Sequence, residues 1–153
     1  MIGLDTAKVV FQVHAVDGAG LVVTRRKLRR DELIAFFEKQ ASCTVVMKAC
    51  GAAHHWARAL TGLGHEVKLI APEAVRPFVK KGKRNDAAAI CEAASRPGVM
   101  FVPIKSLEQQ GVLALHSARP LPVKQQTMLA NAIRGLATEF GLTVALGWAS
   151  SGS

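Results

Sequence analysis

The sequence predicts an α/β domain built on a mixed sheet, followed by a helical arm. Two observations predict the sheet: strand-like segments come first, and short apolar strands then alternate with amphipathic helices. A third observation predicts the arm, because from about residue 106 onward the chain is mostly helix-forming. Half of the 153 residues are hydrophobic, which is ample for one core.

The chain begins with segments that suit antiparallel strands. Residues 2–5 (IGLD) and 9–16 (VVFQVHAV) are strand-like, and in the second segment alternate apolar residues fall on one face. The sequence DGAG at 17–20 suits a hairpin turn, and LVVTRRKL predicts a third strand. We therefore expect two hairpin reversals at one edge of the sheet.

Helices and strands then alternate along the chain. The segment RRDELIAFFEKQ has apolar residues at helical spacing, and short strands are expected at 43–47 and 66–70 with a helix between them. Pro72 begins a short helix that ends near KKGK, and another helix covers about 85–95. This order implies an antiparallel hairpin edge joined to parallel strands, which is the layout of an RNase H-like domain.

The rest of the chain is expected to form a helical arm at 105–146, after a domain at 1–104. Two amphipathic stretches flank the sequence PLP, where Pro120 and Pro122 predict a break in the helix. Residues 147–153 lack periodicity and predict a disordered tail. No apolar run approaches the roughly 18 residues of a membrane span, and no secretory signal opens the sequence, so we expect a cytoplasmic protein with no membrane partner.

The charge balance favours a polyanionic partner. Twenty lysines and arginines against eleven acidic residues give a formal net charge of +9, and nucleic acid is the commonest partner of so basic a protein. The first of two basic runs, TRRKLRR, contains Arg25, Arg26, Lys27, Arg29 and Arg30. The second, RPFVKKGKRN, contains Arg76, Lys80, Lys81, Lys83 and Arg84. Each run either neutralises phosphates or forms a solvated face.

One acid, Asp5, lies in the first strand-like segment. A charged carboxylate is costly to bury unless it is paired or binds a cation, so Asp5 is either a metal ligand or a loop cap at the open end of its strand. The strand at 43–47 is followed by Lys48 rather than by an acid, and Asp86 opens the helix expected at 85–95. Positions three and four residues after Asp86, which share its helix face, are Ala89 and Ile90.

Several stretches resemble the N-terminal half of the DEDD-type insertion-sequence transposases, recombinases that a bridge RNA guides. They include IGLDTAK, LGHEVKLIAPEAVRPFVKKGKRNDA, AICEAASRP and MLANAIRGL, and the resemblance runs over nearly all of the chain. It implies a RuvC-like domain, a role in DNA transposition, and DNA and a structured guide RNA as partners. Because the second basic run flanks the position where the family handles nucleic acid, we expect that run to contact phosphates.

In that family four acids, in the order Asp, Glu, Asp, Asp, bind Mg²⁺, and a C-terminal domain adds a serine nucleophile. The resemblance matches Asp5 to the first acid and Asp86 to the third, while Lys48 stands at the position of the glutamate. The segment that would carry the fourth acid is three residues shorter here, and the sequence ends before the serine domain. Two Mg²⁺ ions need several bridging carboxylates. We therefore expect weak or no Mg²⁺ binding, an ion pair between Lys48 and Asp5, and a truncated, inactive transposase.

Two other classes of protein stay open. Sugar kinases and actin-like ATPases share this fold and begin with an IGxD strand, but they usually place glycine where this chain has Ala7. A non-catalytic interaction protein would use the C-terminal helices to form a homo-oligomer or to cap a full-length transposase. ATP binding would support the first class, and the absence of both ATP and nucleic-acid binding would support the second.

A zinc site is a weaker alternative. Cys50, His54 and His55 lie close together in the sequence, but structural zinc takes four ligands and no second pair has a usable spacing. We expect both histidines to lie on the surface of a helix.

Overall fold

The computed structural model describes residues 1–6, 10–79 and 86–142. The chain divides into two compact units, residues 1–107 and residues 108–153. Expectations for Ala7, for the basic residues Lys80, Lys81, Lys83 and Arg84, and for the tail at 147–153 lie outside the described residues. Among the helices that are described, none combines the length and the apolar composition that crossing a membrane requires.

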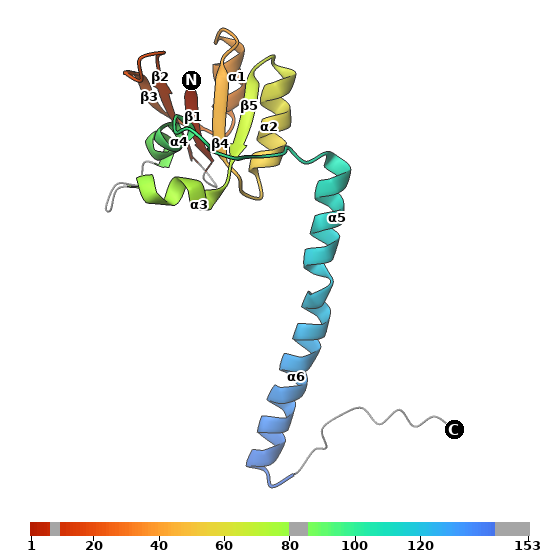
Figure 1. The fold of residues 1–153 in the computed structure, drawn as a ribbon. Helices are drawn as coiled ribbons and strands as arrows, with labels where there is room; N and C mark the ends of the chain where they lie inside the picture. Colours follow the sequence, from red (N-terminus) through yellow and green to blue (C-terminus); the bar gives the residue numbers. More distant parts are fainter. Residues whose placement is uncertain (7–9, 80–85, 143–153) are drawn as a thin grey trace. The chain divides into compact units, whose positions relative to one another are not determined.

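A mixed sheet forms the centre of the first unit (Figure 1). Its strands in chain order are β1 (Ile2–Thr6), β2 (Val10–Val16), β3 (Val22–Arg29), β4 (Thr44–Lys48), β5 (Glu66–Ile70) and β6 (Phe101–Val102). Their order across the sheet is β3-β2-β1-β4-β5-β6. The first three strands pair antiparallel, whereas β1, β4 and β5 run parallel, which confirms the predicted hairpin edge and parallel strands.

The short strand β6 was not expected from the sequence. It pairs antiparallel with β5, through Leu69 with Val102 and Ile70 with Phe101. Two residues are too few to show the alternation that identifies a strand, so only the pairing with β5 reveals it.

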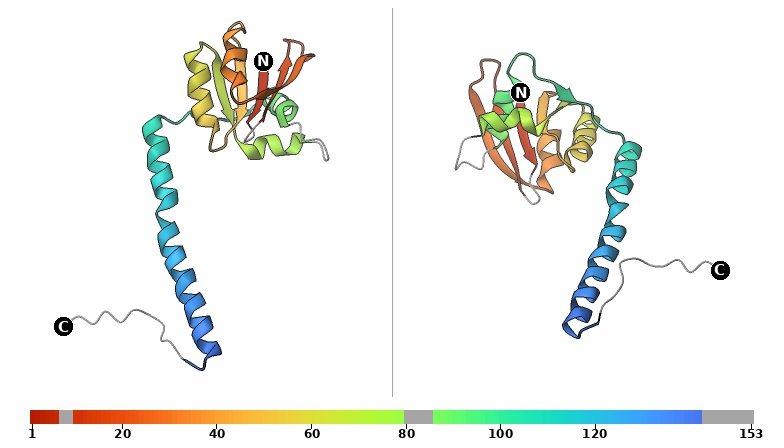
Figure 2. Two further views of the ribbon diagram at one scale, coloured as in Figure 1. Left: turned by 180° about the vertical axis from the view of Figure 1, so that it is seen from behind. Right: turned by 60° about the horizontal axis from the view of Figure 1, so that its bottom comes forward.

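Helices cover both faces of the sheet (Figures 1 and 2). They are α1 (Glu32–Glu38), α2 (Ala53–Gly62), α3 (Pro72–Val75), the 3₁₀ turn η1 (Arg76–Phe78) and α4 (Asp86–Ala94). The apolar residues of α1 and α2 pack in one cluster with Leu4 and Met47. Those of α3 and α4 pack in a second cluster with Val46 and Ile70 on the opposite face.

Gly3 sets the position of α4 on β1. A Cβ atom at this position would collide with the carbonyl oxygen of Ala87 and would lie 2.7 Å from the Sγ atom of Cys91. Glycine is therefore required because the helix backbone rests directly on the strand. This close contact brings the beginning of α4, with Asp86, to the carboxyl end of β1.

The second unit contains two helices in series. They are α5 (Leu107–Ala118), which begins at the boundary between the units, and α6 (Pro120–Glu139), and neither helix has a buried residue. The helical arm is interrupted at Pro120 and Pro122, as expected, but the interruption is short. Only Arg119 separates the helices, because both prolines lie in the first turn of α6, where a missing N–H group is tolerated.

The packing at Gly3 leads to a prediction about stability. Gly3→Ala should lower the free energy of unfolding by about 1–3 kcal/mol, because the added methyl group must displace backbone. The control is Gly62→Ala, at the end of α2, where a Cβ atom meets nothing within 4 Å. Urea unfolding of the two variants tests this, and an equal effect at both positions would contradict the close packing of α4 on Gly3.

Candidate functional site

The carboxyl ends of β1 and β4 bring two opposite charges together. The strands run parallel as neighbours, with Leu4 in register with Met47, so Asp5 and Lys48 follow at the same level. Because side chains alternate along a strand, both point to the face that α4 covers. Asp86, the first residue of α4, completes the cluster.

Lys48 joins the two aspartates. Its Nζ atom donates a hydrogen bond to Oδ2 of Asp86 at 2.6 Å and lies 3.6 Å from Oδ1 of Asp5. The three side chains are partly buried, with exposed fractions of 28% for Lys48, 16% for Asp5 and 26% for Asp86. The expected ion pair between Lys48 and Asp5 is confirmed, but the shorter contact of the lysine is with Asp86.

Burial raises the pKa of Asp5 above its ordinary value. Loss of solvent is the largest cause, and the neighbouring charge of Asp86 raises the pKa further. The ammonium of Lys48 acts in the opposite direction but does not outweigh burial. Asp5 therefore bears its negative charge at a cost in folding free energy.

The pKa of Lys48 is also raised. Burial alone would lower it, but the hydrogen bond to Asp86 and the charges of Asp5 and Asp86 together outweigh burial. The folded state thus holds the lysine proton more tightly than the unfolded state, so this contribution to stability is present at neutral pH and is lost as the pH rises through the folded-state pKa. Lys48 stands between the carboxylates as a cation.

A cavity of about 370 Å³ opens beside this cluster. Lys48 and Asp86 form part of its wall, and α3, η1 and the residue after η1 supply the rest: Pro72, Glu73, Val75, Arg76 and Val79. Of the residues expected to contact phosphates, Arg76 is the one that the structure describes, and it lies on this wall. The cavity thus has two cationic and two anionic side chains around it.

The cluster does not match the ligand set of a magnesium centre. Mg²⁺ takes oxygen ligands, whereas the ammonium of Lys48 supplies none and repels a cation. Ala89 and Ile90, which share the helix face of Asp86, are buried in the apolar cluster and add no carboxylate. Among the described residues, no three His, Cys, Asp or Glu side chains are placed to hold a metal ion.

The expectation for the histidines of α2 is half wrong. His55 is exposed, but His54 is buried, and its Nδ1 atom accepts a hydrogen bond from the backbone N–H of Lys105 at 3.2 Å. That partner lies 51 residues further along the chain, so local helical spacing gives no sign of it. His54 is a structural side chain rather than a zinc ligand.

Comparison with known proteins finds relatives over nearly the whole chain. It is 50% identical over 148 residues to "Putative transposase y4pF/y4sB" of Sinorhizobium fredii and 54% identical over 143 residues to "Probable family 20 transposase" of Pseudomonas aeruginosa. It is 46% identical over 149 residues to "Transposase for insertion sequence element IS1111A" of Coxiella burnetii. All three bear the name transposase.

The transposase relatives are much longer than this chain. The matches cover 92–96% of the chain but 38–42% of the three relatives, so the chain spans about two fifths of their length. No family model matches the sequence. The similarity therefore concerns one part of each relative, matched by nearly all of this chain.

Removal of the bridging cation should destabilise the fold. Lys48→Met keeps much of the side-chain volume but leaves Asp5 and Asp86 facing each other, so the free energy of unfolding at pH 7 should fall by about 1–3 kcal/mol. Lys68→Met on β5 is the matched control, because Lys68 pairs with the exposed Glu66 and lies 5.5 Å from the centre of the Phe101 ring, and the loss of these two surface contacts should cost about 1 kcal/mol or less. Chemical unfolding measures both, and equal losses would contradict a bridging role for Lys48.

The raised pKa of Asp5 predicts a pH dependence. Folded Asp5 holds its proton more tightly than unfolded Asp5, so its ionisation lowers stability as the pH rises above its ordinary value of 3.8. The side chain of Asp5→Asn does not ionise, so the stability of this variant relative to the wild type should increase as the pH rises above 3.8. Urea unfolding at a series of pH values tests the slope, with Asp31→Asn at an exposed position as control. A constant difference between Asp5→Asn and wild type would contradict the assignment.

Proposed function

We propose that this chain is the N-terminal, RuvC-like part of an insertion-sequence transposase, and that it acts in DNA transposition by binding nucleic acid rather than by cutting it. The observation that carries the proposal is the position of Lys48, between two aspartates at the place where the family resemblance puts a metal site. The transposase relatives, which match over almost the entire chain, support the role in transposition.

The sheet supports an RNase H-like fold. Three antiparallel strands lead into parallel strands connected through helices, and helices cover both faces. Asp5 on β1 and Asp86 on α4 come together through the close contact at Gly3. This arrangement is what an acidic site on such a fold requires, although the two carboxylates here converge on an ammonium group.

The charge balance supports the absence of catalysis. Two aspartates and one lysine leave one net negative charge in the cluster, against the four positive charges of two Mg²⁺ ions. Lys48 already occupies the space between the carboxylates and supplies one cationic partner to both. The cluster therefore serves to hold β1, β4 and α4 together, and the chain performs no strand cleavage.

The position of Arg76 and the positive net charge of the chain support binding to DNA and to a structured guide RNA. Arg76 lies on the wall of the cavity beside Lys48, and within the described residues no carboxylate forms an ion pair with it. An arginine without an acidic partner is free to contact a phosphate, and such contacts weaken as salt rises. The high net charge of the chain acts in the same direction.

The helical unit supports assembly with a second transposase chain. Leu129, Ile133, Leu136 and Phe140 are exposed, and their spacings of four, three and four residues follow the heptad pattern of a coiled coil. We propose that this stripe pairs with the same helices of another copy or of a full-length transposase. A non-catalytic chain of this kind retains partner and nucleic-acid binding.

Reversal of the charge at Lys48 tests the proposal. Lys48→Glu creates three converging carboxylates, so this variant should be less stable than the wild type without metal and should regain stability when Mn²⁺ or Mg²⁺ is added. Calorimetric titration should show metal binding by Lys48→Glu and none by the unchanged chain. Lys68→Glu, with the same charge change elsewhere in the sheet, is the control and should not respond to metal. Tight binding of two ions by the unchanged chain would refute the inactive site.

A further inference from the structure

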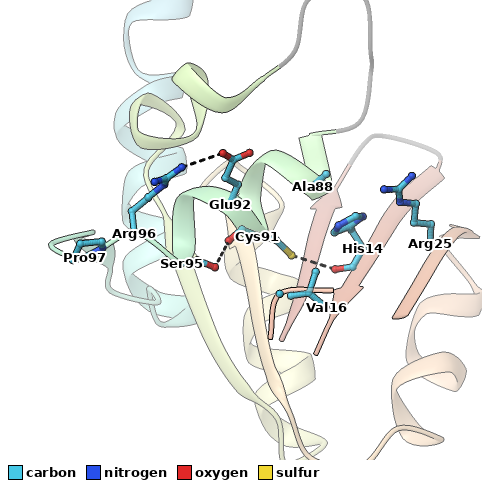
Figure 3. A pocket seen from close by; sticks show the side chains of 10 residues that line it. His14, Val16, Arg25, Ala88, Cys91, Glu92, Ser95, Arg96 and Pro97 are labelled. Atoms are coloured by element: carbon cyan, nitrogen blue, oxygen red, sulfur yellow. Dashed lines mark hydrogen bonds and ion pairs between the residues drawn. The ribbon is translucent and has the colours of Figure 1, made fainter. Parts of the chain in front are cut away.

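The helix α4 also borders a second cavity, on the side of β2 and β3 (Figure 3). Its volume is about 510 Å³, and its polar wall residues are His14 from β2, Arg25 from β3, Glu92 and Ser95 from α4, and Arg96 just after α4. The cluster of Asp5, Lys48 and Asp86 contributes none of these side chains. The cavity is therefore a separate feature of the α4 face of the sheet.

A buried imidazole with one unpaired nitrogen lies in the wall of this cavity. His14 is 5% exposed, and its Nδ1 atom has no hydrogen-bond partner among the residues that the structure describes. The thiol of Cys91 donates to the backbone carbonyl of His14 at 3.2 Å and does not contact Nδ1 of the ring. Buried polar groups in proteins nearly always have partners, so an unpaired Nδ1 in a cavity wall is available to a polar group from outside the chain.

Alternation along β3 separates the arginines of the first basic run. Arg25 is in register with His14 and falls on the α4 face. Arg26 falls on the opposite face, with its guanidinium carbon 5.9 Å from the centre of the Phe36 ring, and Arg30 lies 5.3 Å from the centre of the Trp56 ring. Within the described part of the chain, Arg25 has neither an acidic nor an aromatic partner of this kind.

The cavity has a positive local charge. On the α4 side, Arg96 pairs with Glu92 at 3.2 Å, so these two charges offset each other and Arg25 remains. Burial lowers the pKa of His14, and the charge of Arg25 lowers it further, which favours the neutral imidazole. Figure 3 shows the Arg25 and His14 side chains next to each other on neighbouring strands. An anion bound here would offset the charge of Arg25.

We propose that this cavity binds a phosphate group of a nucleic-acid backbone, with Arg25 as the cationic contact and His14 in the wall. A guanidinium group matches the geometry of phosphate. Across β1, β2 and β3, the residues in register Gly3, His14 and Arg25 lie next to the residues in register Asp5, Gln12 and Lys27, on the same face of the sheet. The inference rests on the proposed nucleic-acid-binding function and adds a contact on the β2–β3 side of α4. A free phosphate ion has the same chemistry, so the experiment must separate the two sources.

Neighbouring arginines on opposite faces of β3 give a matched test. Binding of a fluorescent DNA duplex by the 153-residue chain is followed by anisotropy at several salt concentrations. Arg25→Ala should weaken binding several-fold and reduce the slope of log affinity against log salt by about 1, whereas Arg26→Ala should leave the slope close to that of the wild type. Urea unfolding confirms that both variants are folded. Equal slopes for the two variants would overturn the proposal.

The imidazole of His14 supplies a second readout. Addition of the duplex should shift the His14 ring resonances in NMR spectra of the wild type but not of Arg25→Ala, and inorganic phosphate is titrated separately. If phosphate shifts His14 but the duplex does not bind, the cavity is a site for a free phosphate ion, and both the DNA source and the DNA-binding part of the proposed function are refuted. If the duplex binds in an Arg76-dependent manner while His14 and Arg25→Ala show no effect, the cavity proposal is refuted and the proposed function stands.

Discussion

The charged contact of Lys48 with Asp86 and Asp5 organises this domain. It joins the ends of two parallel strands to the first turn of α4, at a point where the carboxylates would otherwise repel each other. The apolar clusters on the two faces form the buried core, but they do not determine which charged side chains lie at the carboxyl ends of β1 and β4. The lysine makes a stable structural element from two neighbouring carboxylates.

The parts of the fold that were predicted from the sequence are those with strong local patterns. The first three strands show alternation and a clear turn, and the pairing of Lys48 with Asp5 follows because carboxyl ends of neighbouring parallel strands lie at one edge. The arrangement of both residues with Asp86 depends in addition on Gly3, whose role appears only when α4 is packed on β1.

The missed features depend on contacts between distant segments. His54 is buried because the backbone near Lys105 returns to it, and β6 exists because it pairs with β5. His14 occupies the face of β2 that alternation assigns to polar residues, yet α4 covers that face. The prolines after α5 interrupt the arm as expected, but only at Arg119, because both lie in the first turn of α6, where a missing N–H group is tolerated.

The position of α4 has a mechanical consequence. One side of this helix borders the cavity beside Lys48, and another side borders the cavity that contains His14. The backbone of α4 rests on Gly3 without an intervening side chain, so the helix has little room to move closer to β1. A movement of α4 at one cavity would also move it at the other. A ligand that displaced α4 at one cavity would therefore also change the wall of the other.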